Sequence, residues 1–464
     1  MRMRRDKITN VSKFLAWALV ATACGLTNSF AAEETPSTPL PAVRTALSWE
    51  QAIRKAIENQ PLIKVAEREA LESQARIKQI ESANYPQITG LYSNSAGNTR
   101  VLANLNISGS LPKPTNYLTT PGIRADFLIT DFGHTAHRIL SQKSVAASAE
   151  KAVLTSKALT ILTVEQAYLN CLKQQRLVEI AREMMIERDL IRQQTEAFYR
   201  RHLRSKLDLD FASVEVNRAE VVLLKAQNDL EVAFAALNTA MGFQGQGNYV
   251  LEPVIFSVTP AADPESLVQD ALNQRPELLG SKDRVQAAEE ALKAAKALRF
   301  GSVNSIGTLA YTWWGREERP SGKDISNPSA KLGWYGVGVA SSFPLYTGGR
   351  IEGRIEEADA RRGDTQATTR AIANDIVLQV AQAYFSRLTA EQQIKVATEK
   401  VAHAREALTL ARERYKAGLG SILDVVTATS DLLSAEVGLA EAQYDYRASD
   451  AALAYSTGTE YARY

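Results

Sequence analysis

His134 and His137 are the closest pair of histidines in the sequence and the first candidates for metal binding or proton transfer. They lie three residues apart, a spacing that puts two side chains on one face of a helix. A helical zinc site of this kind also carries a glutamate beside a histidine, and neither residue has one here. We therefore expect both to be solvated residues in the first turn of a helix, with no bound metal.

The other reactive side chains are equally sparse. The chain has four histidines and two cysteines, Cys24 and Cys171, which are too few for a disulfide framework or a cysteine-rich zinc site. Cys171 is flanked by Asn170 and Leu172 in a helical pattern and is most simply a packing residue. The glycine-containing run 336–339 lies within a strand pattern, not at the strand-to-helix turn of a nucleotide loop. We expect no catalysis and no cofactor.

Composition narrows the class of protein further. The 464 residues carry a formal net charge of +2, with 45% hydrophobic and 23% charged residues. This balance is typical of an ordered protein. It lacks the basic excess of a general nucleic-acid binder, so we expect no nucleic-acid partner.

The N-terminus resembles an export signal. Five basic residues precede the apolar run 14–26, and small residues follow at 29–31. We interpret residues 1–31 as a secretory signal peptide cleaved after Ala31, because the run is shorter than the ~20 residues of a spanning helix. A weaker pattern, Ala21-Thr22-Ala23-Cys24, leaves lipidation of Cys24 as an alternative.

The sequence contains two copies of one unit. At an offset of 216 residues, a register of about 75 residues matches without a gap. A fixed register that includes glycine, tyrosine and aspartate indicates duplication instead of shared helical composition. The matched pairs include Tyr168 with Tyr384, Tyr199 with Tyr415, Leu203 with Leu419, Ser205 with Ser421, Asp208 with Asp424 and Gly242 with Gly458.

Each copy predicts the same order of elements. A helical segment is followed by a region rich in glycine, serine, threonine and aromatic residues that indicates two strands joined by a loop. A very long helical pattern then runs to an interruption and continues beyond it. The expected segments are 49–83, 86–132 and 134–200 in the first copy, and 264–298, 301–349 and 350–415 in the second. At 1.5 Å per residue, each long helix measures ~100 Å, which favours helices packed side by side as coiled coils.

The strands predict a sheet with two different faces. Ile123, Ala125 and Phe127 alternate with Arg124 and Asp126, so one face is apolar and the other polar. Four strands cannot close a membrane barrel, which needs at least eight, but three chains supply twelve. Tryptophan and tyrosine residues concentrate in the second strand pair, as expected for side chains at a membrane interface. They are Tyr311, Trp313, Trp314, Trp334 and Tyr335.

This organisation resembles the TolC family of outer-membrane efflux and secretion ducts. The resemblance covers residues 47–460 and includes the junction Phe343-Pro344-Leu345-Tyr346-Thr347-Gly348-Gly349-Arg350 and the run from Tyr415 to Val426. It implies a mainly α fold with transmembrane β-structure: a TolC-like homotrimer with a 12-stranded β-barrel in the outer-membrane lipid and a 12-helix α-barrel in the periplasm of a Gram-negative bacterium. It also implies passive conduction of cargo, a periplasmic adaptor, and an inner-membrane pump of the RND, ABC or MFS type. A soluble periplasmic coiled-coil scaffold or adaptor is the alternative.

The predicted domain boundaries follow from the duplication. The repeats span residues 47–243 and 266–460 and are joined by a proline-containing linker, 244–265. The remaining segments are the signal peptide 1–31, an extended N-terminal lead 32–46 and a C-terminal tail 461–464.

The resemblance also assigns residues to a periplasmic entrance. Asp424 matches a family carboxylate that faces the channel axis, and Asp208 is implied to bond to Tyr415 and hold the entrance closed. Capping of the following helix is the alternative role for Asp424. The family's gating arginine is replaced by Gly420, and Arg204 occupies the equivalent position in the first copy.

The two interruptions of the helical patterns are the expected hairpin tips. Glycine permits a left-handed turn there, and an exposed leucine suits contact with an adaptor. Ordinary turn chemistry is the alternative. The predicted contact residues are Leu203, Ser205, Gly418, Leu419 and Ser421.

Overall fold

The computed structural model describes residues 45–98, 115–245, 249–254, 263–317 and 330–459. Residues 46–464 form one unit. The predicted signal peptide, Cys24, most of the N-terminal lead, the turn signals between the paired strands and the C-terminal tail lie outside the described residues. None of the described helices is both long and apolar enough to cross a lipid bilayer.

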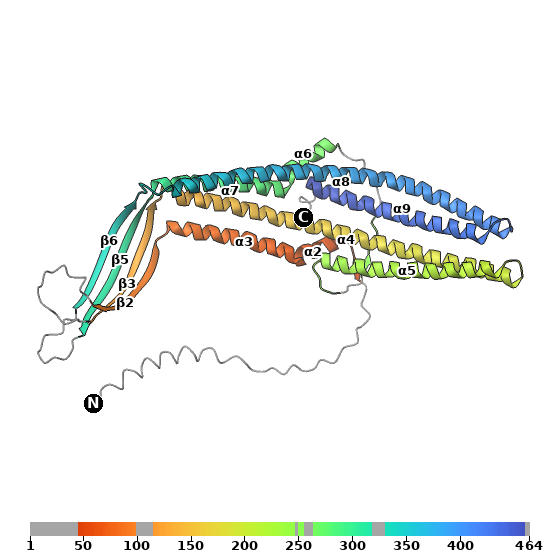
Figure 1. The fold of residues 1–464 in the computed structure, drawn as a ribbon, viewed down its shortest axis with the longest axis horizontal. Helices are drawn as coiled ribbons and strands as arrows, with labels where there is room; N and C mark the ends of the chain where they lie inside the picture. The colour runs from red at the N-terminus through yellow and green to blue at the C-terminus, as the bar shows by residue number, and fades with distance from the viewer. Residues whose placement is uncertain (1–44, 99–114, 246–248, 255–262, 318–329, 460–464) are drawn as a thin grey trace, which may run out of the picture. The chain divides into compact units, whose positions relative to one another are not determined.

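The order of elements occurs twice, as the duplication predicts (Figure 1). The first series is α2 (Trp49–Asn59), α3 (Pro61–Glu81), η1 (Ser82–Asn84), β2 (Gln87–Asn98), β3 (Thr115–Thr130), α4 (His134–Arg200) and α5 (Lys206–Ala240). The second is α6 (Pro264–Gln274), α7 (Pro276–Ala297), η2 (Leu298–Phe300), β5 (Ser302–Glu317), β6 (Ala330–Ser342), α8 (Arg350–Lys416) and α9 (Ile422–Thr457).

Proline divides the first helical segment of each copy into two helices. Pro61 and Pro276 occupy the first helical position of α3 and α7, where a missing N–H group costs nothing. The preceding residues, Gln60 and Arg275, are extended, as residues before proline prefer to be. The expected single helices 49–83 and 264–298 are therefore pairs of helices.

The four long strands form one antiparallel sheet in the order β2-β3-β5-β6. Its register aligns Ile88, Ala125, Gly307 and Val337 across the strands, and the next row on the same face contains Ile123, Leu309 and Tyr335. The opposite face carries the ion pair between Arg124 and Asp126. The predicted apolar and polar faces are confirmed. Trp313 shares the apolar face, but Trp334 projects from the other face and donates to Thr312.

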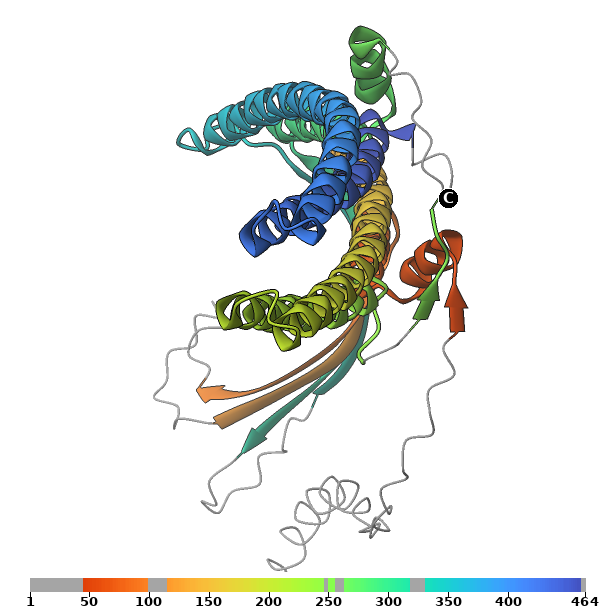
Figure 2. The same cartoon turned by 90° about the vertical axis from the view of Figure 1, so that its right-hand side faces the viewer.

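The long helices pair within each copy and between copies. Helix α4 packs on α5, α8 packs on α9, and α4 also packs on α9 (Figure 2). Between α4 and α9, Ile180 and Met184 enclose Ala440. The small alanine side chains allow such close helix approach along these seams.

A small two-stranded sheet of β1 (Thr45–Leu47) and β4 (Tyr249–Leu251) was not predicted. It joins the end of the N-terminal lead to the linker between the copies. The Tyr168 hydroxyl lies 3.0 Å from both the Leu47 and Glu252 carbonyl oxygens and donates to this pair. Burial raises the pKa of Tyr168 to about 12. Tyr168 thus fixes this sheet to α4.

Candidate functional site at the hairpin ends

The two hairpins end in turns of the same geometry. The turns join α4 to α5 and α8 to α9, and the residues at equivalent positions, His202 and Gly418, have φ angles of 59° and 75°. The Leu203 and Leu419 N–H groups each donate to a carbonyl five residues earlier at 2.9 Å, which is the Schellman pattern. The first copy therefore holds a histidine in a left-handed conformation where the second uses glycine.

Each helix after a turn begins with a capping box. The Asp424 N–H donates to Ser421 Oγ at 3.2 Å, and the Ser421 N–H donates back to Asp424 Oδ2 at 3.0 Å. Ser205 and Asp208 form the same box, with both distances 3.2 Å. The alternative role for Asp424, capping the helix, is thus present in the structure. The Asp424 side chain is nevertheless exposed and accessible to other contacts.

Tyr415 is the residue that connects the two hairpins. Its side chain is 5% exposed, whereas its equivalent Tyr199 is 37% exposed. The Tyr415 hydroxyl lies 3.4 Å from Thr195 Oγ1 on α4, and its ring contacts Phe198 at a centroid distance of 6.4 Å. Within the described part of one chain, the expected bond between Asp208 and Tyr415 is not formed, because the Asp208 carboxylate accepts from Ser205.

Arg204 completes this contact. Its Nη2 donates to the Tyr415 carbonyl at 2.7 Å, and its guanidinium lies 4.3 Å from the centre of the Tyr415 ring. At the equivalent position, a Cβ on Gly420 would come within 3.3 Å of both Arg414 Cβ and the Tyr415 N. The first copy therefore supplies the arginine, Arg204, that contacts Tyr415 of the second copy.

A buried ion pair that was not predicted joins α4 to α5. Arg188 Nη1 lies 2.9 Å from Glu215 Oε2, and both side chains are almost fully buried. Arg188 also donates through Nη2 to Ser430 Oγ on α9 at 3.2 Å. Arg412 and Glu187 form another ion pair between the copies. The paired residues are 27 or more positions apart in the sequence, so no local spacing pattern could have predicted these ion pairs.

The predicted contact residues at the tips are accessible in the single chain. Leu203 is 65% exposed and Leu419 is 75% exposed, and Ser205, Gly418 and Ser421 are exposed as well. Leu207 and Leu423, the second residues of α5 and α9, are both 64% exposed. Each tip therefore presents two leucines that are largely exposed.

The expectation that the two histidines are merely solvated is wrong. His137 Nδ1 lies 2.7 Å from Glu290 Oε2, and His134 Nδ1 lies 2.8 Å from the Ala294 carbonyl oxygen. Both side chains join α4 to α7. Hydrogen bonds from Lys293, which has the larger effect, and from His137 hold the pKa of Glu290 below its usual range. Among the described residues, no group of three or more histidine, cysteine or acidic side chains is arranged to hold a metal ion.

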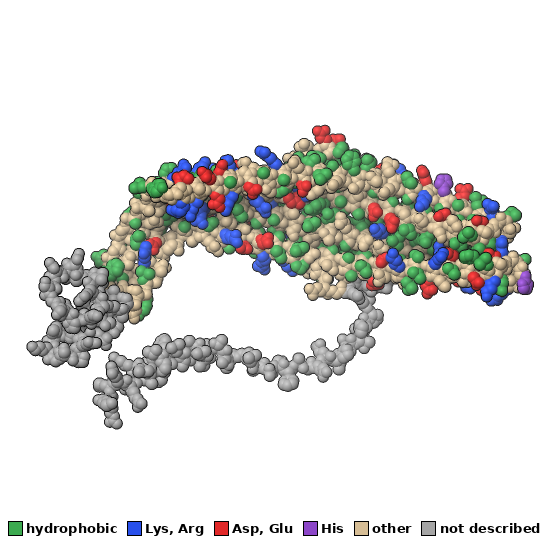
Figure 3. Space-filling model, in the orientation of Figure 1, with side chains coloured by type: hydrophobic (Ala, Val, Ile, Leu, Met, Phe, Trp, Pro, Cys, Tyr) green, Lys and Arg blue, Asp and Glu red, His purple; other side chains and the backbone are tan. Residues whose placement is uncertain are grey.

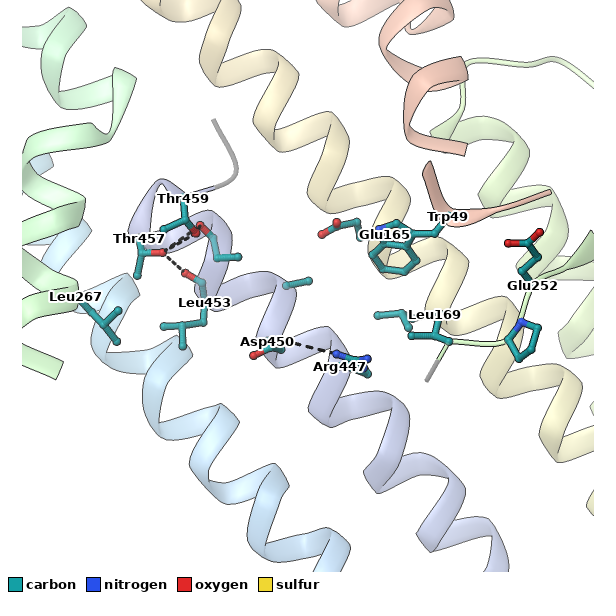
Figure 4. Close-up of a pocket in the computed structure, with 14 residues that line it drawn as sticks. Trp49, Glu165, Leu169, Glu252, Leu267, Arg447, Asp450, Leu453, Thr457 and Thr459 are labelled. Atoms are coloured by element: carbon teal, nitrogen blue, oxygen red, sulfur yellow. Dashed lines mark hydrogen bonds and ion pairs between the residues drawn. The ribbon is translucent and has the colours of Figure 1, made fainter. Parts of the chain in front are cut away.

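A recess of about 600 Å³ lies between α4 and the end of α9 (Figure 4). Apolar side chains such as Trp49 and Leu169 line it beside Glu165 and Asp450. Arg447 pairs with Asp450 at 4.0 Å. Of the described residues around this recess, none is a histidine, serine or cysteine that could act as a nucleophile. Cys171 is buried in the hydrophobic core, as expected, and burial raises its pKa to about 12.

Comparison with known proteins identifies relatives over almost the entire described chain. The family model described as outer membrane efflux protein matches residues 52–243 and 267–459. The outer membrane efflux protein BepC of Brucella suis is 22% identical, with 82% of this chain and 78% of BepC aligned. The cation efflux system protein CusC of Escherichia coli K12 is also 22% identical, over 88% of this chain and 85% of CusC.

Solved structures share the fold. A crystal structure of CusC has a TM-score of 0.75 at 19% identity and covers 92% of this chain and 99% of its own. The outer membrane protein VceC of Vibrio cholerae has a TM-score of 0.71 at 19% identity, covering 88% of this chain and 96% of VceC.

Proposed function

The chain belongs to the outer membrane efflux protein family, and on that premise we propose that three copies form one exit duct. The protein is an outer-membrane efflux channel of a Gram-negative bacterium. Its relatives bear the names of efflux components, including a cation efflux system protein and an antibiotic efflux pump outer membrane protein. A soluble scaffold or adaptor does not account for this family membership.

The proposal of a trimer is based on the open edges of the sheet. Strands β2 and β6 each pair on one side only within the described residues. An open edge in lipid leaves backbone N–H and C=O groups without partners, which costs several kcal/mol per group. Pairing β6 of one copy with β2 of the next removes every edge when the ring closes. Three copies give the 12 strands that a barrel of this family needs, with the apolar face toward lipid.

The long helices support the same assembly. Along α5 and α8, large apolar side chains remain exposed in the single chain. Large apolar side chains that are exposed in this number favour burial against another chain. In the proposed trimer α4, α5, α8 and α9 of the three copies form a 12-helix barrel that crosses the periplasm. The side chains include Val221, Leu224 and Val232 on α5, and Phe385, Val396 and Leu410 on α8.

The hairpin tips form the proposed periplasmic entrance. Three copies of Asp424 would place a ring of negative charge there and attract cations. We assign the closing contact to Tyr415 with Arg204, and Asp208 to the capping box beside it. The exposed tip residues Leu203, Ser205, Gly418, Leu419 and Ser421 are the proposed contacts for a periplasmic adaptor, which connects the duct to an inner-membrane pump of the RND, ABC or MFS type.

Fractionation and crosslinking test this assembly. The mature protein should stay with the outer membrane and, after detergent extraction, should migrate as an SDS-resistant species. Chemical crosslinking should produce dimers and trimers and stop at three chains. A largest species of one or two chains would contradict the proposed 12-stranded barrel, because one chain supplies four strands and two chains supply eight.

A further inference from the structure

A recess of about 400 Å³ lies where the sheet joins the helices of the second copy. Arg299 lines it from η2, opposite Leu345 and Tyr346 of the loop before α8. Gly301 makes this juxtaposition possible: its φ angle is 77°, and a Cβ there would come within 1.9 Å of the Ser342 carbonyl oxygen. Only glycine allows the two segments to approach so closely.

The loop beside Arg299 is unusually exposed for its chemistry. Leu345 is 98% exposed and Tyr346 is 90% exposed, and hydrophobic side chains are visible at this corner of the molecule (Figure 3). Exposing an aliphatic and an aromatic side chain to water has a free-energy cost of about 25 cal/mol for each Å² of apolar surface. The exposure of Leu345 and Tyr346 therefore favours contact with a nonaqueous partner.

The surface that continues from this loop is the apolar face of the sheet. Phe132 contacts both Phe300 and Phe343, with ring centroids 6.0 Å and 6.3 Å apart, at the end of the strands nearest the helices. Val339 lies on the apolar face of β6, a few residues before Phe343. Aromatic side chains at the end of a lipid-facing surface mark the interface between hydrocarbon and headgroups. The recess thus lies at headgroup depth.

The recess carries one charge of each sign. Arg299 and Glu352 both line it, and within the described part of the chain neither forms an ion pair. An arginine guanidinium suits a phosphate group, since it offers several N–H donors in one plane. A carboxylate and an aromatic ring together suit an ammonium group. A ligand with phosphate and ammonium on one headgroup matches both.

We propose that this recess binds a zwitterionic aminophospholipid from the periplasmic leaflet of the outer membrane. Arg299 binds the phosphate, Glu352 and Tyr346 bind the primary ammonium group, and Leu345 contacts the acyl chains. The proposal rests on the proposed function only in requiring that the sheet lies in the outer membrane.

The first copy provides an internal comparison. At the equivalent positions it has Asn84 for Arg299, Ile129 for Leu345, Thr130 for Tyr346 and Ala136 for Glu352. Neither charge nor the aromatic ring is present there. The site therefore occurs once in each chain, and a trimer should bind three such lipids.

Native mass spectrometry of the detergent-extracted full-length mature protein tests the site. The protein is mixed separately with phosphatidylethanolamine, phosphatidylglycerol and phosphatidylcholine of identical acyl chains. We expect one phosphatidylethanolamine per chain and weaker retention of the other two lipids. Arg299→Gln should lower phosphatidylethanolamine retention roughly tenfold, because a charge-assisted hydrogen bond is lost.

Glu352→Gln provides the second variant, because it should remove the preference for phosphatidylethanolamine over phosphatidylglycerol while Arg299 still binds phosphate. Arg370→Gln, an exposed substitution on α8, is the matched control and should change neither quantity. Equal retention of all three lipids by the unmodified protein would overturn the proposal. So would crosslinking of residue 346 to a second copy, which would assign the exposed loop to the contact between chains.

A failure of the lipid site is distinguishable from a failure of the duct. If Arg299→Gln retains lipid like the unmodified protein while crosslinking still stops at three chains, only the lipid site is wrong. If crosslinking fails to reach three chains and the protein is absent from the outer membrane, the duct itself is wrong.

Discussion

The guanidinium of Arg204 lies 4.3 Å from the centre of the Tyr415 ring and donates to the Tyr415 carbonyl oxygen at 2.7 Å. One residue thus contacts both the ring and the backbone of the other. The contact joins the turn after α4 to the last turn of α8, which belong to different copies of the duplicated unit. If the entrance opens by separation of these hairpins, the contact must break.

Arg204→Ala should therefore favour the open state. Loss of a cation–π contact and a charge-assisted hydrogen bond should raise the open probability of reconstituted channels roughly tenfold. Tyr415→Phe should have a smaller effect, because the ring remains and only the 3.4 Å contact to Thr195 is lost. Single-channel recording measures both. Arg201→Ala, an exposed neighbour in the same turn, is the control, and an equal effect of Arg201→Ala would assign the change to turn charge alone.

Asp424→Asn should relieve block by multivalent cations applied from the periplasmic side. Asparagine keeps an oxygen that can accept from the Ser421 N–H, so it removes the charge while retaining the helix cap. Asp208→Asn makes the same change in the first copy and should alter the block less. Current recordings at increasing cation concentration decide the question: unchanged block in Asp424→Asn would restrict Asp424 to its capping role.

Glu215→Gln should destabilise the protein by about 3–5 kcal/mol, because it leaves the buried Arg188 guanidinium without its carboxylate. The double variant Arg188→Leu/Glu215→Leu should lose less stability than Glu215→Gln alone, since it leaves no buried charge. Thermal unfolding of the detergent-extracted protein measures the difference. Arg218→Ala, which removes only the exposed partner of Glu215, is the control. Equal losses in all three proteins would mean that the pair is not desolvated.

The contact between α4 and α7 should weaken in acid. The pKa of Glu290 is lowered in the folded protein by Lys293 and His137, so its stabilising effect is present above the unfolded-state value of about 4.3. This stabilisation is lost as the pH falls through the lower folded-state value. Hydrogen exchange of α7 should therefore accelerate below about pH 4. Glu290→Gln should remove that pH dependence, and persistence of the dependence in this variant would assign it to another group.

The helices and strands could be predicted because their signals are local. The long helix expected at 134–200 is α4, and the one expected at 350–415 is α8, one residue longer. Alternation around Ile123 correctly predicted an apolar and a polar face of the sheet, since successive side chains of a strand point in opposite directions. The duplication also required no structure, because it is a fixed register within the sequence.

Tertiary structure alone decided which side chains meet at the hairpin ends. Arg204 and Tyr415 are 211 residues apart in the sequence, and Arg188 and Ser430 are 242 residues apart. The predicted bond from Asp208 to Tyr415 does not form in the chain, because the nearby Ser205 N–H provides Asp208 with a local partner. The packing of α4 against α9 and of α9 against α8 brings Arg204 to the Tyr415 ring. No short stretch of sequence encodes that packing, so its consequences could be determined only from the folded chain.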